Sequence, residues 1–473
     1  MKSLVGRKQE ITLLTGALKS NRSELIVVYG RRRIGKTYLI REVYKNHIQF
    51  EFSGIHKASF RDQLKNFNLT LSAKSSKSKH SSDWIEAFYQ LSKFLNKLKS
   101  KQKKVIFIDE FPWLDTRKSN FLGAFDNFWN SYASKRKDLV VVICGSAASY
   151  MIKNIIKNKG GLHNRLTQQI QLNPFNLNET EQLLKHNKVK LSRYEILQVH
   201  MAMGGVPHYL EKIIPGESVA QLLDRLCFSK NGFLRTEFNN VFASLFDQYD
   251  NHETIIRTLA TVRKGLTRNN ILLKSKINSG GTLTKTLEDL EESGFIEKYT
   301  PYKGSKDAVY RLADEYSMFY IKFIENTKPS NKSIWMKMQG QQSYKIWSGF
   351  SFETTCLKHI EQIKEGLKIS GIHSTHGSWT SKSTRNGAQI DLLIDRDDNV
   401  INLCEMKFYN AEYVLDKKYC NEITNKINSF ISGTKTKKSI FTTFITTYGL
   451  SPNQYKRQYV QNELTMEHLF LEL

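Results

Sequence analysis

The sequence has few prolines, few cysteines and no long hydrophobic run. With 7 prolines in 473 residues, long disordered segments are not expected. The five cysteines are widely spaced, without a CxxC pair or a Cys/His cluster, which argues against a disulfide framework and a structural zinc site. No stretch approaches the roughly 18 apolar residues that a membrane span needs, and the polar start MKSLVGRKQE does not resemble a signal peptide. We therefore expect a cytoplasmic protein with no membrane partner.

Acidic residues are also scarce relative to basic ones. Lys and Arg number 71 against 45 Asp and Glu, which gives a formal net charge of +26. The positive electrostatic field of such a protein attracts polyanions. Nucleic acid, and DNA in particular, is the commonest intracellular candidate. Solubility is the alternative explanation, and charge alone does not separate the two. At about 150 residues per domain, the chain is long enough for several domains, and three are expected.

Residues 1–225 alternate short apolar runs with longer helical patterns. The runs at 25–29, 105–108 and 139–144 are rich in β-branched residues and short enough to be buried central strands. Strands that alternate with helices predict an α/β fold with a parallel sheet. Residues 71–83 are rich in Ser and Lys and are expected to form an exposed loop.

Two further domains are expected after the first. In residues 226–327, helical patterns at 255–262 and 283–290 precede a strand-like stretch at 295–312 that PYKGSKD interrupts. Helices followed by a basic hairpin are typical of a winged helix. Residues 328–473 combine helices with strands and predict a small α/β domain, and the first eight of them, KPSNKSIW, are expected to be a linker.

The strongest local signal is a phosphate-binding loop. The string GRRRIGKT, residues 30–37, follows an apolar strand and opens a helical pattern, which is the context that a P-loop requires. Its glycines let backbone N–H groups turn toward phosphates. Lys36 would pair with the β- and γ-phosphates, and the Thr37 hydroxyl would ligate Mg²⁺. The residues expected to contact ATP are Gly30, Arg31, Arg32, Arg33, Ile34, Gly35, Lys36, Thr37, Tyr38 and Ser146.

Four further positions suit a nucleotide site that hydrolyses ATP. The run VIFIDEF ends in Asp109, which we expect to hold the magnesium, and in Glu110, which would polarise the attacking water. Ser146 ends the third strand, where it would sense the γ-phosphate or simply cap a helix. Arg165 would be an arginine finger, in its own chain or a neighbour's, or an ordinary solvated arginine.

Several of these segments together resemble the archaeal-type ATPases, P-loop proteins near the AAA+ and STAND groups. The similar segments are VGRKQEI, GRRRIGKT, FIDEFPWL, the ICGS strand end, the Arg165 region and MGGVPHYL. The resemblance implies an ATPase core, a helical lid that contains GGVP, and a winged helix. A homo-oligomer is expected with it. The chain departs from the family pattern at Asn164, where a glycine usually precedes the arginine.

Two strand patterns near the C-terminus indicate a second site. Asp391 lies amid apolar residues in AQIDLLID, while Glu405 and Lys407 share one face of NVINLCEMKF, about 6 to 7 Å apart. Their order resembles the PD-(D/E)XK arrangement of restriction-endonuclease-like domains, and Glu353 in an upstream helix suits the acid that often joins it. Asp391 and Glu405 would hold Mg²⁺ or Mn²⁺, and Lys407 would stabilise the charge developing on a phosphate.

The expected winged helix is rich in lysine. Its side chains could hold a DNA backbone, although four acids in TLTKTLEDLEESG argue against deep insertion into the major groove, and winged helices also dock proteins. The lysines are Lys274, Lys276, Lys285, Lys298, Lys303 and Lys306.

Three functions remain open from the sequence. The first is an ATP-regulated enzyme with a metal-dependent nuclease-like domain that acts on nucleic acid, as in DNA repair or antiphage defence. The second is an ATP-dependent, STAND-like switch or scaffold in which that domain is inert. The third is a motor that moves or loads nucleic acid.

Overall fold

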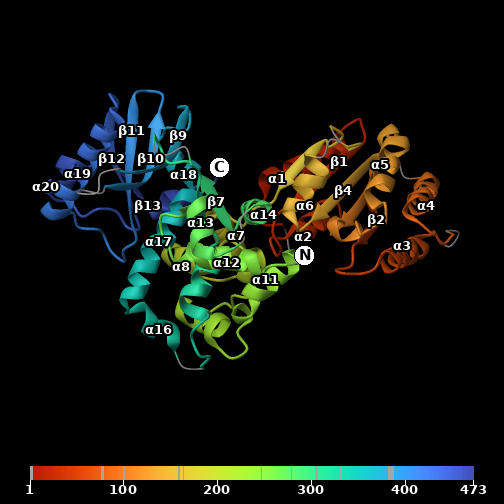
Figure 1. Ribbon diagram of the computed structural model, residues 1–473, viewed down its shortest axis with the longest axis horizontal. Helices are drawn as coiled ribbons and strands as arrows, with labels where there is room; N and C mark the ends of the chain where they lie inside the picture. The colour runs from red at the N-terminus through yellow and green to blue at the C-terminus, as the bar shows by residue number, and fades with distance from the viewer. Residues whose placement is uncertain are drawn as a thin grey trace. The chain divides into compact units, whose positions relative to one another are not determined.

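A computed structural model describes residues 4–75, 79–99, 102–157, 160–162, 164–246, 248–277, 280–303, 307–330, 333–381 and 388–473 (Figure 1). The chain forms two compact units. The first is Met1–Asn173 with the short pieces Ser244–Asp247 and Glu292–Gly294, and the second contains the rest.

The first unit contains a five-stranded parallel sheet with the strand order β2-β3-β4-β1-β5. The three apolar runs predicted to be central strands are its β1, β3 and β4, so the predicted α/β fold is confirmed for this unit. Figure 1 shows β1, β4 and β2 in the red-to-yellow part of the chain. The strands are β1 (Glu24–Tyr29), β2 (Ile48–Ser53), β3 (Lys104–Asp109), β4 (Leu139–Gly145) and β5 (Gln168–Gln171).

Helices cover both faces of this sheet because the central strands are apolar on both sides. In β1, Leu25 and Val27 join one core, whereas Ile26 and Val28 join the other. The first core is closed by α3 (Phe60–Lys74), α4 (Trp84–Lys97) and α5 (Phe121–Ser131), and the second by α1 (Lys8–Lys19) and α2 (Lys36–Val43).

The expectation of an exposed loop from residue 71 is wrong at its start. Helix α3 continues to Lys74, and Leu71 is 1% exposed. Leu71 extends the apolar stripe of Leu64 and Phe67 at helical spacing, so burial of this stripe outweighs the polar composition that follows. Residues 76–78 lie outside the described residues.

The second unit begins with helices α7 (Leu177–His186), α8 (Arg193–Met203), α9 (Pro207–Leu210) and α10 (Val219–Leu223). Capping boxes begin α7 at Asn176 and α8 at Ser192. Helices α11 (Glu237–Leu245), α12 (Asp250–Ala260), α13 (Arg268–Ser275) and α14 (Gly281–Glu292) follow. A three-stranded antiparallel sheet accompanies them, in the order β6-β8-β7, from β6 (Leu266–Thr267), β7 (Ile296–Tyr299) and β8 (Val309–Leu312).

A five-stranded mixed sheet forms the C-terminal part of the second unit, in the order β13-β12-β11-β10-β9. Its strands are β9 (Ser374–Thr380), β10 (Gln389–Arg396), β11 (Val400–Lys407), β12 (Ser439–Thr446) and β13 (Asn462–Thr465). The helices around it are α17 (Gln342–Lys358), α18 (Ile360–Gly366), α19 (Lys417–Thr434), α20 (Gln454–Tyr459) and α21 (Met466–Leu469). Figure 1 shows β9 to β12 in blue. The strands predicted around Asp391 and Glu405 are β10 and β11.

The segment expected to be a linker is structured at its end. Helix α16 (Ile334–Gln339) begins there, and Trp335 is 1% exposed, stacked on Phe228 with ring centroids 6.0 Å apart. Phe319 and Trp347 also surround the Trp335 ring. The hydrophobic effect on one large side chain therefore overrides the polar character of its neighbours.

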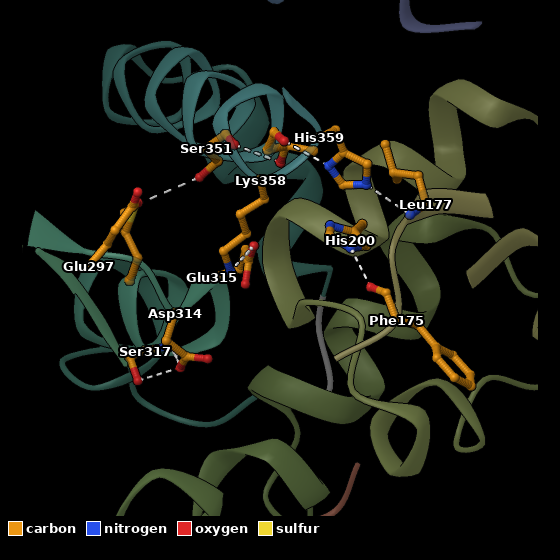
Figure 2. A network of polar contacts seen from close by, with 12 residues as sticks. Phe175, Leu177, His200, Glu297, Asp314, Glu315, Ser317, Ser351, Lys358 and His359 are labelled. Atoms are coloured by element: carbon orange, nitrogen blue, oxygen red, sulfur yellow. Dashed lines mark hydrogen bonds and ion pairs between the residues drawn. The ribbon is translucent and has the colours of Figure 1, made fainter. Parts of the chain in front are cut away.

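A buried polar network joins the α7 and α8 region to α17 (Figure 2). The N–H of Leu177 donates to His359 Nε2 at 3.0 Å, so the other ring nitrogen, Nδ1, carries the proton that is donated to the Thr355 carbonyl at 2.7 Å. Burial lowers the pKa of His359 to about 3. Beside it, Lys358 donates to Glu315 at 2.6 Å. The histidine is thus held neutral between two segments of the unit.

All five cysteines are buried and free of disulfides. Over the described ranges, no helix combines the length and the hydropathy needed to cross a membrane.

Candidate functional site

The GRRRIGKT segment forms a tight loop between β1 and α2. Gly30 has φ +142°, and a Cβ there would lie 2.2 Å from the Leu172 carbonyl oxygen, so only glycine fits. Gly35, at φ +88°, immediately precedes the first turn of α2. The loop therefore ends at the N-terminus of a helix, where backbone N–H groups favour phosphate.

Lys36 is buried within this loop. Its Nζ donates to the carbonyl oxygens of Gly30 and Arg31, both at 2.8 Å. Burial lowers the pKa of Lys36, and the nearby Asp109 and Glu110 carboxylates oppose that shift. The lysine side chain is therefore held inside the loop by two of the loop's own carbonyl oxygens.

The other residues of the loop differ in exposure. Arg31 and Ile34 are buried, Arg33 is half-buried with φ +71°, and Arg32 and Tyr38 are exposed. The three arginines therefore lie in different environments. Of the loop residues expected to contact ATP, Arg32 and Tyr38 are the most accessible to solvent.

Two oxygen ligands expected to hold Mg²⁺ lie together. The Thr37 hydroxyl donates to Asp109 Oδ2 at 2.7 Å, and Asp109 Oδ1 accepts the N–H of Glu110 at 2.9 Å. A hydroxyl and a carboxylate are the hard oxygen ligands that Mg²⁺ prefers. This pair fits a magnesium ion that also keeps water and phosphate ligands.

Glu110 and Ser146 also meet. The Ser146 hydroxyl donates to Glu110 Oε1 at 2.7 Å and its N–H donates to Oε2 at 3.2 Å. They meet because β3 and β4 are neighbours and both side chains follow the carboxyl ends of these strands. Ser146 therefore orients the carboxylate expected to polarise water.

Arg165 is exposed in the segment before β5. A second arginine, Arg7, was not among the predicted site residues, although it lies in the VGRKQEI segment. It is 6% exposed and its Nη2 donates to the carbonyls of Asn173 at 2.6 Å and Ile34 at 3.3 Å. Arg7 thereby supports the phosphate loop from the N-terminal segment.

The C-terminal acids converge on one lysine. The β10–β11 register pairs Leu392 with Cys404, so the next pair outward is Asp391 with Glu405. Lys407 Nζ lies 3.9 Å from Glu405 Oε2. Burial lowers the pKa of Lys407, whereas the carboxylates of Glu405, Glu353 and Asp391 raise it. The four residues predicted from the sequence therefore form one electrostatic cluster.

Glu353 has the most perturbed carboxyl group of the cluster. It lies on α17, and its pKa is raised to about 7, first by burial and then by the Asp391 charge. Arg263 and Lys407 oppose this shift. A carboxyl group with a pKa near neutrality can exchange a proton at neutral pH.

Each acid also has partners that the sequence did not reveal. Glu405 accepts from the Tyr419 hydroxyl and from Lys426 Nζ, each at 2.5 Å. Both lie on α19, seven residues and hence two helical turns apart. This spacing, which places them on one face of the helix, was the only sequence signal for the pair. Asp391 contacts Gln389 on its own strand and Arg263, which no local pattern indicates.

A cation bound at the cluster would have to draw most of its ligands from water or substrate. Within the parts of the chain that the structure describes, no group of three or more His, Cys, Asp and Glu is arranged to hold a metal. Mg²⁺ commonly uses one or two carboxylates together with waters and substrate phosphates. Asp391 and Glu405, or Asp391 and Glu353, suit that mode.

Two cavities share Asp391 and Arg263 as lining residues. One, of about 860 Å³, contains Glu353 together with apolar side chains such as Trp347 and Phe350. The other, of about 1000 Å³, is mostly polar and extends along α19. Asp391 and Glu353, but not Glu405, therefore border these cavities.

The basic residues of the expected winged helix lie at the surface. Lys306 lies outside the described residues, and the exposed lysines are Lys274, Lys276, Lys285, Lys298 and Lys303.

Residues 4–213 match the family model described as an ATPase domain predominantly from Archaea. The matched segment contains the phosphate loop, Asp109, Glu110 and Arg165, so this part of the chain is an archaeal-type ATPase domain, as the resemblance predicted. An uncharacterized protein of Methanocaldococcus jannaschii is 26% identical over 400 residues, which is 84% of this chain and 85% of that protein. An uncharacterized ATP-binding protein of the same organism is 45% identical over 42 residues, 9% of this chain and 71% of the relative.

Several solved structures are distantly similar to this chain. The Walker-type ATPase of Pyrococcus abyssi matches 68% of this chain and 96% of its own, at 16% identity and a TM-score of 0.47. The ORC2 protein of Aeropyrum pernix, solved as ADPNP–ADP complexes, matches 67% and 92%, at 13% identity and a TM-score of 0.40. A STAND protein of Pyrococcus horikoshii matches 77% and 50%, at 16% identity and a TM-score of 0.33. Likenesses at this level are too distant to assign a substrate or a partner.

Proposed function

We propose that this protein hydrolyses ATP and that its nucleotide state controls a metal-dependent nuclease in the C-terminal part of the chain. The set of contacts among the acids carries the proposal: Lys407 lies 3.9 Å from Glu405, and Arg263 forms ion pairs with both Glu353 and Asp391. The three carboxylates are accompanied by three cationic side chains, Lys407, Arg263 and Lys426, and such a concentration of partly buried charge is typical of functional sites.

In the ATPase domain, Lys36 would contact the β- and γ-phosphates, while Thr37 and Asp109 would hold the accompanying Mg²⁺. Glu110, oriented by Ser146 at 2.7 Å, would align the attacking water. Arg165 is exposed, so it is available to a nucleotide bound by a neighbouring copy in a homo-oligomer.

In the second unit, we assign α12, α13, α14 and the β6-β8-β7 sheet to a winged helix, and residues 328–473 to a restriction-endonuclease-like domain. The helices followed by a hairpin support the first assignment. The β10–β11 hairpin that carries Asp391, Glu405 and Lys407, with Glu353 on the preceding α17, supports the second.

The chemistry of the cluster suits hydrolysis of a phosphodiester. When bound by Asp391 and a second acid, Mg²⁺ or Mn²⁺ would polarise the phosphate and lower the pKa of a bound water. Lys407 would stabilise the charge that develops on the phosphate oxygens. Glu353, with its pKa near 7, could accept or return a proton. Nucleic acid is the substrate class that also suits the net charge of +26.

A cleavage assay tests this proposal. Labelled single- and double-stranded DNA and RNA are incubated with the full chain and Mg²⁺ or Mn²⁺, with and without ATP. We expect metal-dependent products whose yield changes with ATP, and their loss in Asp391→Asn and Lys407→Ala. Cleavage that survives both substitutions would contradict the assignment of the site.

A second function is favoured by one observation. Both Glu405 oxygens are already held by Tyr419 and Lys426, which suits a cluster that maintains the fold. In that case the protein is an ATP-dependent switch or scaffold of the STAND type, and a protein partner would dock on the winged helix. This alternative predicts ATP-dependent assembly, abolished in Lys36→Ala, without any cleavage.

A further inference from the structure

Arg263 links the expected winged helix to two acids of the C-terminal cluster. It lies between α12 and β6, and its Nη2 forms ion pairs with Glu353 and, at 3.5 Å, with Asp391. Its guanidinium carbon lies 4.1 Å from the centre of the Phe350 ring. One cationic side chain thus bridges two carboxylates proposed to hold a metal ion.

A metal ion and this guanidinium would compete for the two acids. Arg263 engages one oxygen of Glu353 and one of Asp391, and a divalent cation bound to the same carboxylates would be repelled by the nearby guanidinium charge. The contact therefore lowers the affinity of the pair for a cation as long as Arg263 stays there.

The Arg263 side chain can leave while its backbone stays in place. The neighbouring Lys264 carbonyl accepts a hydrogen bond from the Tyr299 hydroxyl at 2.8 Å, which fixes the loop. The Arg263 side chain is 40% exposed, and its contact with Asp391 is at the outer limit of a hydrogen bond. A rotamer change would release both acids, at the cost of the ion pair with Glu353 and the contact with the Phe350 ring.

A phosphate group in the polar cavity would give Arg263 another anion to bind. Arg263, Lys264, Lys303 and Lys426 line it, against two acids, Asp391 and Glu422. The other lining residues are rich in the amide and hydroxyl side chains that contact nucleic-acid backbones. Guanidinium groups bind phosphate through two parallel hydrogen bonds, whereas the contacts of Arg263 with Glu353 and Asp391 both come from Nη2.

We propose that Arg263 is a substrate-responsive positioning residue: without substrate it neutralises Glu353 and Asp391, and a phosphodiester in the polar cavity draws it away so that the acids can bind metal. The inference rests on the proposed nuclease function. It makes metal binding and nucleic-acid binding mutually reinforcing, because each removes the contact that opposes the other.

Calorimetric titration of the full chain with Mn²⁺ tests this coupling, with and without a short phosphorothioate DNA that resists cleavage. We expect Arg263→Gln to bind Mn²⁺ about tenfold more tightly than the wild type without DNA. DNA should strengthen Mn²⁺ binding by the wild type but hardly change that of Arg263→Gln. Arg263→Lys, which keeps the charge, should stay closer to the wild type, and Arg268→Gln is the matched control without a contact to the acids.

Equal Mn²⁺ affinities of wild type and Arg263→Gln would overturn the inference, as would Mn²⁺ binding that DNA leaves unchanged in the wild type. Asp391→Asn separates this failure from failure of the proposed site. If Asp391→Asn abolishes Mn²⁺ binding while Arg263→Gln has no effect, the metal site stands and the role of Arg263 is wrong. If Asp391→Asn binds Mn²⁺ like the wild type, the proposed metal site is wrong and the inference fails with it.

Discussion

The Thr37 hydroxyl donates a hydrogen bond to Asp109 Oδ2 at 2.7 Å, across 72 residues of sequence. This contact joins the first turn of α2 to the end of β3. It fixes one edge of the phosphate loop and presents two oxygens on the same side. The geometry of the nucleotide site is therefore built into the sheet, and each part of it can be tested separately.

The first prediction concerns Lys36. Lys36→Ala removes the ammonium group that the loop carbonyls hold at 2.8 Å, so we expect MgATP affinity to fall at least about tenfold, the loss of one charge-assisted contact. Calorimetric titration with a non-hydrolysable ATP analogue measures it. Lys45→Ala, at an exposed position just beyond the same helix, should bind like the wild type; equal affinities in all three proteins would refute the assignment.

A second prediction separates hydrolysis from binding. Glu110→Gln keeps the shape of the side chain but removes the base, so the ATP hydrolysis rate should fall about 100-fold or more while nucleotide affinity is retained. Ser146→Ala frees the Glu110 carboxylate and should cost about tenfold. The measurement is phosphate release under saturating ATP. Full activity of Glu110→Gln would show that another group aligns the water.

Trp335 supplies a stability prediction with an adjacent control. Trp335→Ala empties a site that five aromatic rings surround, and should lower the free energy of unfolding by about 3–5 kcal/mol. Met336→Ala changes a neighbouring side chain that is 63% exposed and should have little effect. Urea titration followed by circular dichroism measures both. Similar midpoints for the two variants would contradict the burial of Trp335.

His359 predicts how stability depends on pH. Its pKa is lowered to about 3 in the folded protein but returns to about 6.5 on unfolding. The unfolded state therefore binds a proton more readily below pH 6.5, and the stabilising contribution, complete above that pH, declines toward pH 3 by up to about 1.4 kcal/mol per pH unit. Urea midpoints at about pH 7.5 and pH 5 should differ more in the wild type than in His359→Gln. An equal difference would contradict a neutral, buried imidazole.

Local signals predicted the ATPase domain well. The phosphate loop, Asp109 and the three central strands all follow from short apolar runs with polar residues at their ends, and parallel strands bring such ends together. Strand alternation and motif spacing suggested Asp391, Glu405 and Lys407, and the resemblance to restriction-endonuclease-like domains suggested Glu353. The roles of these four residues and the boundaries of the domain that contains them remain predictions.

Contacts made by tertiary packing could not be predicted in the same way. Trp335 lies in a polar segment that suggested a linker, and nothing next to it in the sequence shows the rings that enclose it. Arg263 reaches Asp391 from 128 residues away, and no period or motif connects the two. Tyr419 and Lys426 have a helical spacing, yet that spacing does not identify Glu405 as their partner.

The most direct measurement is metal-dependent cleavage of labelled DNA and RNA under single-turnover conditions, with and without ATP, by the wild type, Lys36→Ala and Asp391→Asn. ATP control of a C-terminal nuclease predicts that the wild type cuts at a rate that ATP changes, that Lys36→Ala cuts at a rate that ATP does not change, and that Asp391→Asn does not cut. If the wild type cleaves none of these substrates while its ATP hydrolysis is intact, the nuclease function is contradicted. The ATP-dependent switch or scaffold is then the remaining function.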